Sequence, residues 1–247
     1  MNAQSTFIGG VVVLLVTAGA ARAQQSETVI EIIDQSSAES PLKLSGSLRC
    51  VETIQGPGRV RTILTGKLAS TNVTEKPILA YVVRVDVTTP LGRYRTMRQQ
   101  IDCAFVQQLL DPHQTWYDEI STDSTETDEI ISDQSVKAAE IAPAQPTARA
   151  RVSWVQFVGG SEYGDRREAR PLLDARNALR DKLNRLMRAY ERSGESAFAE
   201  ELMIDEHTRG TRPFVRRLRR IYSERGIEAA IRLIRRALHN ARANLGP

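Results

Sequence analysis

Arginine is concentrated near the carboxyl end of the chain. Residues 209–242 hold eleven arginines and no lysine, and their only carboxylates are Glu224 and Glu228. Seven of the arginines flank the apolar stripes of two predicted helices: Arg216, Arg217, Arg219 and Arg220 on one, and Arg232, Arg235 and Arg236 on the other. A guanidinium presents a planar fork of N–H donors that matches phosphate and carboxylate groups. These seven side chains are therefore a candidate anion-binding site.

A simpler interpretation is that the arginines form a solvated face, which is the usual role of a run of charge. The same face would also attract an acidic segment, and the chain has one. Residues 118–135 contain seven carboxylates and no basic residue, and residues 142–146 read Ala-Pro-Ala-Gln-Pro. This composition predicts a mobile acidic and Pro-rich insert near residues 118–147. It is not typical of a calcium loop, because it lacks the glycine and the alternating aspartates of such loops.

The chain has two cysteines, Cys50 and Cys103, and both lie on the apolar side of strand-like runs. An even number of cysteines in an exported protein favours a disulfide, so we expect a Cys50–Cys103 bridge. The alternative is two buried free thiols that pack as small apolar groups.

Other reactive residue types form no recognisable catalytic pattern. The histidines His113, His207 and His239 are far apart in the sequence, and none has the spacing of metal ligands. Tyr163 stands where a nucleophile elbow around Ser161 would need glycine. The chain also lacks a phosphate loop and a dinucleotide fingerprint. We therefore expect no catalytic residue, no metal and no cofactor.

The amino terminus has the pattern of a secretory signal. Residues 7–20 are apolar, and Ala21-Arg22-Ala23 follows with small residues at the positions that signal peptidase reads. As a helix the apolar run would be about 21 Å long, short of a hydrocarbon core of about 30 Å. This predicts a signal peptide over residues 1–23, with an uncleaved anchor as the alternative. No later stretch is long enough to span a membrane, so we expect an exported protein that is periplasmic or secreted.

Residues 24–160 predict a β-rich domain. Seven apolar runs are separated by turn residues: 29–33, 42–51, 60–68, 78–87, 94–105, 116–120 and 148–158. The run 78–87 is apolar on both faces at its start, so we expect it at the centre of its sheet. Short strands at roughly 8 to 12 residue spacing are typical of an antiparallel sandwich.

A resemblance points the same way. Residues 64–92, LTGKLASTNVTEKPILAYVVRVDVTTPLG, resemble the strand–turn–strand core of bacterial extracytoplasmic immunoglobulin-like domains. The shared features are a Gly-x-hydrophobic strand, an Asn-x-Thr turn, a Lys-Pro-Ile entry and an alternating strand that ends in Asp and Gly. The hallmarks of antibody domains are absent, since Ile101 and not tyrosine stands two residues before Cys103. The resemblance implies an antiparallel immunoglobulin-like β-sandwich and an extracytoplasmic location, and it lends no catalytic residue.

Residues 161–247 predict a small, basic helical domain, which makes the fold class α+β. After Gly159-Gly160 the apolar period changes to about 3.6 and predicts four amphipathic helices. The first begins near Pro171 and ends at Gly194, and Gly226 separates the last two. Residues 166–247 hold 20 Lys and Arg against 11 Asp and Glu, a net +9, whereas the whole chain is +4. Such asymmetry indicates either an anionic partner or attraction between the two halves.

Two functions are compatible with these features. The first is a non-catalytic, exported binding or scaffolding protein of the cell envelope. The second is an extracytoplasmic hydrolase whose site is assembled from residues scattered along the chain. The absence of a local catalytic signature favours the first. The partner would be an anionic envelope polymer or a lipid head group, and nucleic acid is disfavoured because only Phe214 and Tyr222 could stack on bases near the arginines.

Overall fold

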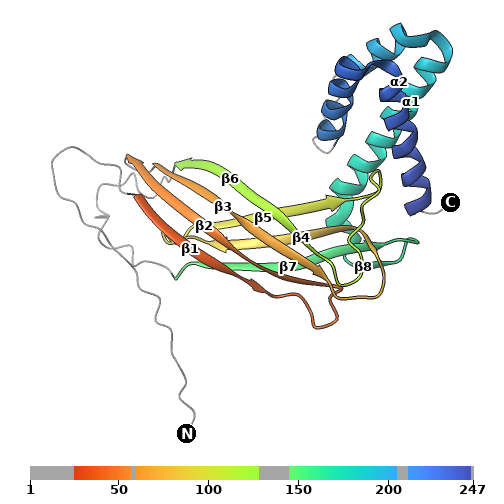
Figure 1. The fold of residues 1–247 in the computed structure, drawn as a ribbon. Helices are drawn as coiled ribbons and strands as arrows, with labels where there is room; N and C mark the ends of the chain where they lie inside the picture. The colour runs from red at the N-terminus through yellow and green to blue at the C-terminus, as the bar shows by residue number, and fades with distance from the viewer. Residues whose placement is uncertain (1–24, 57–58, 128–144, 205–210, 246–247) are drawn as a thin grey trace.

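The computed structural model describes residues 25–56, 59–127, 145–204 and 211–245. Within these ranges the chain forms one sheet of eight strands followed by two helices (Figure 1). The strands are β1 Gln25–Asp34, β2 Leu42–Gly56, β3 Arg59–Asn72, β4 Ile78–Thr88, β5 Tyr94–Asp102, β6 Thr115–Thr127, β7 Thr147–Phe157 and β8 Glu162–Gly164. The helices are α1 Arg166–Met203 and α2 Arg212–Leu245. The predicted signal peptide, residues 1–23, lies outside the described residues.

The sheet curls until it is nearly closed, like a barrel. Its strand order is β5-β4-β7-β1-β2-β3-β6, and the short β8 pairs with β7. Neighbouring strands are antiparallel except β1 and β7, which run parallel where Ile32 lies opposite Ala148. The two outer strands approach each other, because Gln99 Nε2 on β5 donates to the backbone oxygen of Glu119 on β6 at 3.2 Å.

The predicted immunoglobulin-like sandwich is therefore wrong. A sandwich has two separate sheets that face each other, whereas this chain has one continuous mixed sheet. The strand responsible is β1: its first part pairs with β2, and its last residues pair with β7. A period of two shows which residues of a strand face the core, but it is the same in a sandwich and in a barrel. The pairing of β1 with both neighbours depends on contacts between residues far apart in the sequence.

The strand β4 lies inside the sheet, between β5 and β7, as its two apolar faces predicted. Residues 78–83 are all buried. Tyr81 and Val83 belong to the cluster inside the barrel. Ala80 and Val82 point the other way and pack against the start of α1. The outer face of β4 is thus covered by the helix that the chain forms directly after the barrel.

Each helix is broken at a glycine into two limbs. Gly194 in α1 has a φ of 73° and Gly226 in α2 has a φ of 75°, which is the left-handed region that favours glycine. Both breaks lie where the sequence predicts a helix end. The start of α1 was predicted five residues too late, because the Asp165 side chain caps the helix by accepting from the Arg167 backbone N–H, and Pro171 lies inside it.

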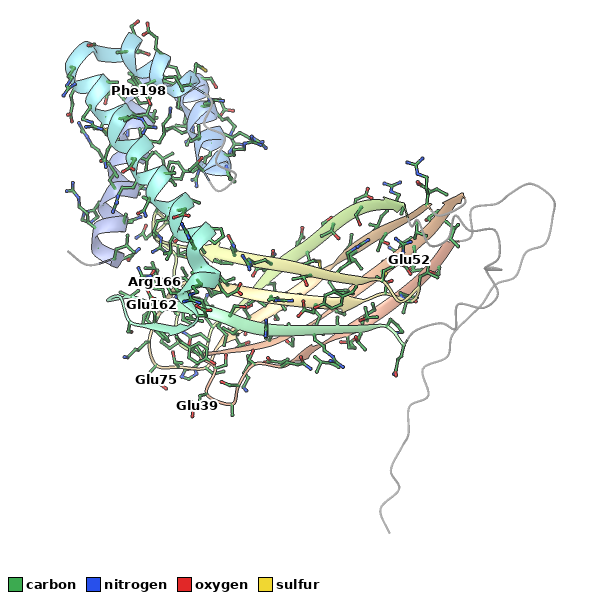
Figure 2. The ribbon with its side chains drawn as sticks, turned by 180° about the vertical axis from the view of Figure 1, so that it is seen from behind. Glu39, Glu52, Glu75, Glu162, Arg166 and Phe198 are labelled. Atoms are coloured by element: carbon green, nitrogen blue, oxygen red, sulfur yellow. The ribbon has the colours of Figure 1, made fainter. Side chains whose placement is uncertain are left out.

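The four limbs pack together and against one end of the barrel (Figures 1 and 2). Their shared core includes Leu183, Leu218 and Ile234, together with Cys103 and Phe105 from the segment that follows β5. Figure 2 shows Arg166 at the base of α1, beside the barrel, and Phe198 at the far end of the helices. Among the described residues, no helix combines the length and the apolar character needed to cross a membrane.

The first third of the predicted acidic insert is a strand, not a loop. Residues 118–127 belong to β6, where Asp123 pairs with Arg61 of the neighbouring β3. Threonine is common in β6 and favours strands, and pairing with β3 outweighs the high content of charge. Residues 128–144 of the insert lie outside the described residues. The β6 strand ends, and β7 begins, at the barrel end opposite the helices, so attraction between this acidic strand and the arginines gains no support (Figure 1).

Candidate functional site

A buried arginine fixes α1 on the barrel. Arg176 is 94% buried, and its Nε and Nη2 both lie 2.9 Å from the carboxylate of Asp102 at the end of β5. Its Nη1 donates to Gln156 Oε1 on β7 at 2.7 Å. The carboxylate balances the charge of this guanidinium, and three of its five N–H donors form hydrogen bonds. This cluster therefore has a structural role and leaves no charge available to a ligand.

Two further basic residues hold the carboxyl end of α1. Lys182, which is fully buried, donates to the backbone oxygen of Glu201 at 2.6 Å and pairs with the Glu201 carboxylate at 3.1 Å. Arg219 of α2 donates to the backbone oxygens of Leu202 and Met203. Backbone oxygens at the end of a helix lack helical partners and carry partial negative charge. Basic side chains from other limbs satisfy them here, since the last turn of α1 has none of its own.

The pKa of Glu201 reflects the basic side chains around the carboxyl end of α1. Burial would raise the pKa of its carboxyl group, but hydrogen bonds from Lys182 and Arg185 outweigh burial and lower that pKa. Glu201 therefore carries its negative charge at neutral pH between two cations. This part of the helical domain is internally balanced.

The seven predicted anion-binding arginines do not form one cluster. Arg219 caps the end of α1 and lines a small hollow with Arg216. Three others, Arg217, Arg232 and Arg236, share a second hollow. Arg235 lines a third, and Arg220 lines none of these hollows. The arginines of the first limb point in different directions around the helix, and the break at Gly226 brings the second limb, with Arg232 and Arg236, next to Arg217.

The hollow shared by three of the predicted arginines lies in the bend of α2, and we call it the α2 crease. It has a volume of about 320 Å³ and is lined by residues of both limbs: Arg217, Ile221, Arg225, Ala229, Arg232, Leu233 and Arg236. In the described part of the chain, none of its four arginines forms an ion pair or a hydrogen bond with a carboxylate. The two carboxylates of α2, Glu224 and Glu228, line no part of it. Four cations thus surround a small apolar floor without compensation.

Arg225 belongs to this crease but was missed by the sequence analysis. The signal was present, because Arg217, Ile221 and Arg225 recur every four residues and so share one face of the first limb. What the sequence could not show is that the second limb would fold back along that same face.

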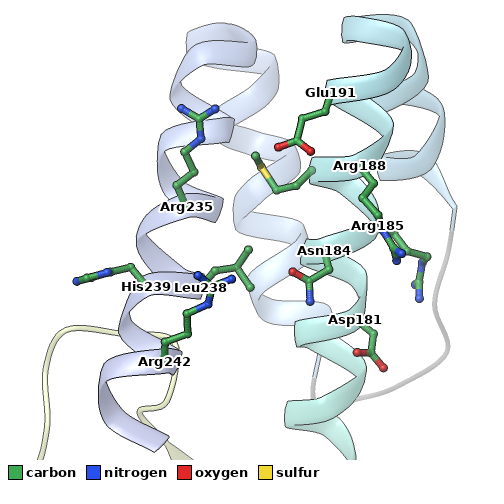
Figure 3. A pocket seen from close by; sticks show the side chains of 10 residues that line it. Asp181, Asn184, Arg185, Arg188, Glu191, Arg235, Leu238, His239 and Arg242 are labelled. Atoms are coloured by element: carbon green, nitrogen blue, oxygen red, sulfur yellow. The ribbon is translucent and has the colours of Figure 1, made fainter. Parts of the chain in front are cut away.

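The third hollow, which Arg235 lines, is a larger groove that separates α1 from the second limb of α2 (Figure 3). Its volume is about 800 Å³, and Arg188, Arg235 and Arg242 contribute positive charge. Figure 3 shows Asp181 and Glu191 on α1 facing the same space, and Arg185 beside them already pairs with Glu201. The groove therefore mixes both signs of charge, and the α2 crease is the more strongly basic surface.

The predicted disulfide is absent, and both cysteines are buried free thiols. Cys50 lies inside the barrel with Leu48 and Leu64, whereas Cys103 lies in the core shared with the helices. Burial raises the pKa of each thiol to about 12, so both remain protonated at neutral pH. The apolar side of a strand predicts burial correctly, but it does not tell in which of two cores a side chain will lie.

No assembled catalytic group is found among the described residues. His113 is exposed and lies 3.1 Å from Glu75, His239 lines the groove between the helices, and His207 lies outside the described residues. A search of the described residues finds no group of three or more His, Cys, Asp or Glu able to hold a metal ion.

Comparison with known proteins adds no assignment: no protein-family model matches the chain, and no curated protein matches it.

Proposed function

We propose that this chain is an exported, non-catalytic binding or scaffolding protein of the cell envelope, and that its helical domain binds an anionic envelope polymer or lipid head group. The observation that carries the proposal is the α2 crease, where Arg217, Arg225, Arg232 and Arg236 converge without a carboxylate partner among the described residues. Four uncompensated guanidinium groups repel one another, and an anion bound among them relieves that repulsion. Arginine is also the side chain best suited to phosphate and carboxylate ligands.

Charge pairing in the barrel contrasts with the arginines of the α2 crease and supports the same function. On the barrel, Arg49 pairs with Glu27, Arg61 with Asp123 and Arg84 with Asp86. The barrel therefore offers little unbalanced charge at these positions and acts as the scaffold on which the helices stand. Export rests on the apolar residues 7–20 and the Ala21-Arg22-Ala23 site, and it accounts for where an anionic envelope component would be met.

The test is co-sedimentation of the protein with anionic vesicles and with neutral vesicles, and retention on an immobilised polyanion, across a salt series. We expect binding only to the anionic surfaces, with a steep loss as salt rises, because basic side chains displace condensed or screening counterions. The double variant Arg232→Glu/Arg236→Glu should abolish binding.

The matched control is Arg180→Glu/Arg192→Glu, which changes the net charge equally. Both residues are exposed on α1, and they line neither the α2 crease, nor the hollow that holds Arg216 and Arg219, nor the groove between α1 and α2. This variant should keep most of the binding. Equal losses in the two variants would show that only net charge matters, and no binding at low salt would refute the proposed function.

A further inference from the structure

A cavity lies where the barrel meets both helices. Its volume is about 390 Å³, within the range of sites for small ligands. The wall is mainly apolar and comes from three parts of the chain: Phe105, Val106, Leu172, Leu179, Pro213 and Phe214. Val106 is 38% exposed at this wall. The cavity therefore offers an apolar group a place to leave water.

The polar atoms in this wall do not require a polar ligand. Asp102 and Arg176 line the cavity, but they bind each other through two hydrogen bonds of 2.9 Å, and Arg176 also binds Gln156. A ligand that entered here would gain mainly by burying apolar surface, at about 25 cal/mol per Å². Gln100 and Arg217 also line the cavity, and the rest of its wall is apolar, so it is suited to a hydrocarbon chain whose polar end lies beside Arg217.

The cavity and the α2 crease meet at one residue, because Arg217 lines both hollows. Along the first limb of α2, Pro213, Arg217, Ile221 and Arg225 are spaced by four residues, so each is a surface neighbour of the next in a row that winds slowly round the helix. Pro213, at the start of this row, lines the apolar cavity, and Ile221 and Arg225, at its end, line the crease. One molecule with an apolar tail and an anionic head would cover both.

We infer that this face binds a single phospholipid, with an acyl chain in the cavity between barrel and helices and the phosphate on the arginines of the crease. The inference rests on the proposed function, because the phosphate is the anionic head group named there, and it adds the class of ligand and the position of its chain. Arg217 lies at the boundary, where the phosphate of a lipid meets its hydrocarbon part.

The experiment measures binding of water-soluble phosphatidic acids with four-carbon and eight-carbon chains, and of polyphosphate, which has no chain. Isothermal calorimetry is performed on the protein as recovered from its native compartment, below the concentration at which the lipids form micelles. Affinity should rise by about fourfold for each methylene that enters the cavity. Arg225→Gln/Arg232→Gln should weaken the binding of both phosphatidic acids by about tenfold or more.

Substitutions that fill the cavity distinguish binding of the lipid chain from binding of the phosphate. Ala175 lines the cavity, and Ala175→Phe should reduce the affinity for the eight-carbon lipid to that for the four-carbon lipid while leaving polyphosphate binding unchanged. Val106→Trp fills the same space from the barrel side and provides a second test if Ala175→Phe does not fold. Ala243→Phe, at an exposed position near the end of α2, should have no effect.

The outcomes distinguish the two proposals. Binding that rises with chain length and is lost on filling the cavity supports the inference. Binding that depends on the arginines but not on chain length overturns the inference and leaves the proposed function standing. Failure of every anion to bind, polyphosphate included, overturns both.

Discussion

The barrel and α2 deal with charge in opposite ways. On the barrel, charged side chains of neighbouring strands pair across the sheet, as Arg49 does with Glu27 and Arg61 with Asp123. On α2, ten arginines face two glutamates, and the four arginines of the α2 crease have no carboxylate partner among the described residues. A fold gains little from unpaired like charges, and for this reason the proposed anionic partner is assigned to α2 and not to the barrel.

The two regions also have largely separate cores. The cluster inside the barrel holds Leu48, Leu64 and Val83, and the helical cluster holds Leu183, Phe198 and Ile234. The contacts between them include Arg176, the segment Cys103–Phe105, and the cluster in which Ala80, Val82 and Trp154 pack against Ala169 and Leu172 of α1. We therefore expect that disrupting the core of the helices unfolds the helices and leaves the barrel folded.

The largest effect is expected for Ile234→Asp, which places a carboxylate in the fully buried core of the helices. Because an unpaired buried charge is penalised by several kcal/mol, we expect the helical signal in circular dichroism to collapse while the strand signal remains. Arg220→Asp, at an exposed position of the same helix, is the control. Loss of both signals together would show that the two regions fold as one unit.

The next effect tests the link between the regions. Arg176→Met leaves Asp102 and Gln156 without their partner, and we expect a loss of about 3 kcal/mol in the free energy of unfolding. The double variant Arg176→Met/Asp102→Leu removes the stranded carboxylate and should recover part of this loss. Chemical denaturation followed by circular dichroism measures both, and an unchanged free energy in the single variant would contradict the role given to Arg176.

A smaller effect concerns pH, and it has opposite signs at two carboxyl groups, one in each region. In the helices the pKa of Glu201 is lowered, so its contribution to stability is present above the pKa of the unfolded chain and is lost as the pH falls through the folded pKa. In the barrel, burial outweighs the hydrogen bond from Tyr81 and raises the pKa of Asp118. Its contribution is fully present below the unfolded pKa and is lost as the pH rises through the folded pKa.

Amide hydrogen exchange across the acidic range checks this pair of signs region by region. Acidification should increase exchange near the carboxyl end of α1 and protect the neighbourhood of Asp118 in β6. Glu201→Gln and Asp118→Asn should each remove the pH dependence of its own region only. A change in exchange of the same sign in both regions would show that these two carboxyl groups do not control the pH dependence of stability.

The smallest effect is expected for reduction of the protein. Because Cys50 and Cys103 are free and lie in different cores, a reductant should leave the free energy of unfolding unchanged. Two thiols should titrate in denaturant without reductant, and neither should react quickly in the folded state, where burial raises the pKa of each to about 12. A free energy of unfolding that falls when reductant is added would instead support the predicted Cys50–Cys103 bridge.

Much of the local structure was predictable because it depends on neighbours in the sequence. The alternation in residues 78–87 predicts a strand, and its two apolar faces predict an inner position, which the structure confirms. Gly194 and Gly226 were predicted to end helices, and both adopt the left-handed conformation there. The acidic residues 118–127 misled composition-based reasoning, since pairing with β3 holds them in a strand.

The candidate site was predicted in part. Of the seven arginines singled out from the sequence, three, Arg217, Arg232 and Arg236, meet in the α2 crease. Arg219 has a capping role instead, and Arg225 was missed, because both outcomes depend on how the limbs fold against each other. The apolar cavity that adjoins the crease was invisible in the sequence, since its wall is assembled from β5's end, α1 and α2.

The sequence by itself determined the strand and helix periods, the glycines at which the helices break, and the excess of arginine over carboxylate on α2. These features follow from side-chain chemistry and from contacts a few residues apart. Only the tertiary structure decided that β1 joins both halves of one curled sheet, that Cys50 and Cys103 enter different cores, and that the arginines divide among separate hollows. Each of these depends on which distant segments pack together, and the local pattern is the same for several such arrangements.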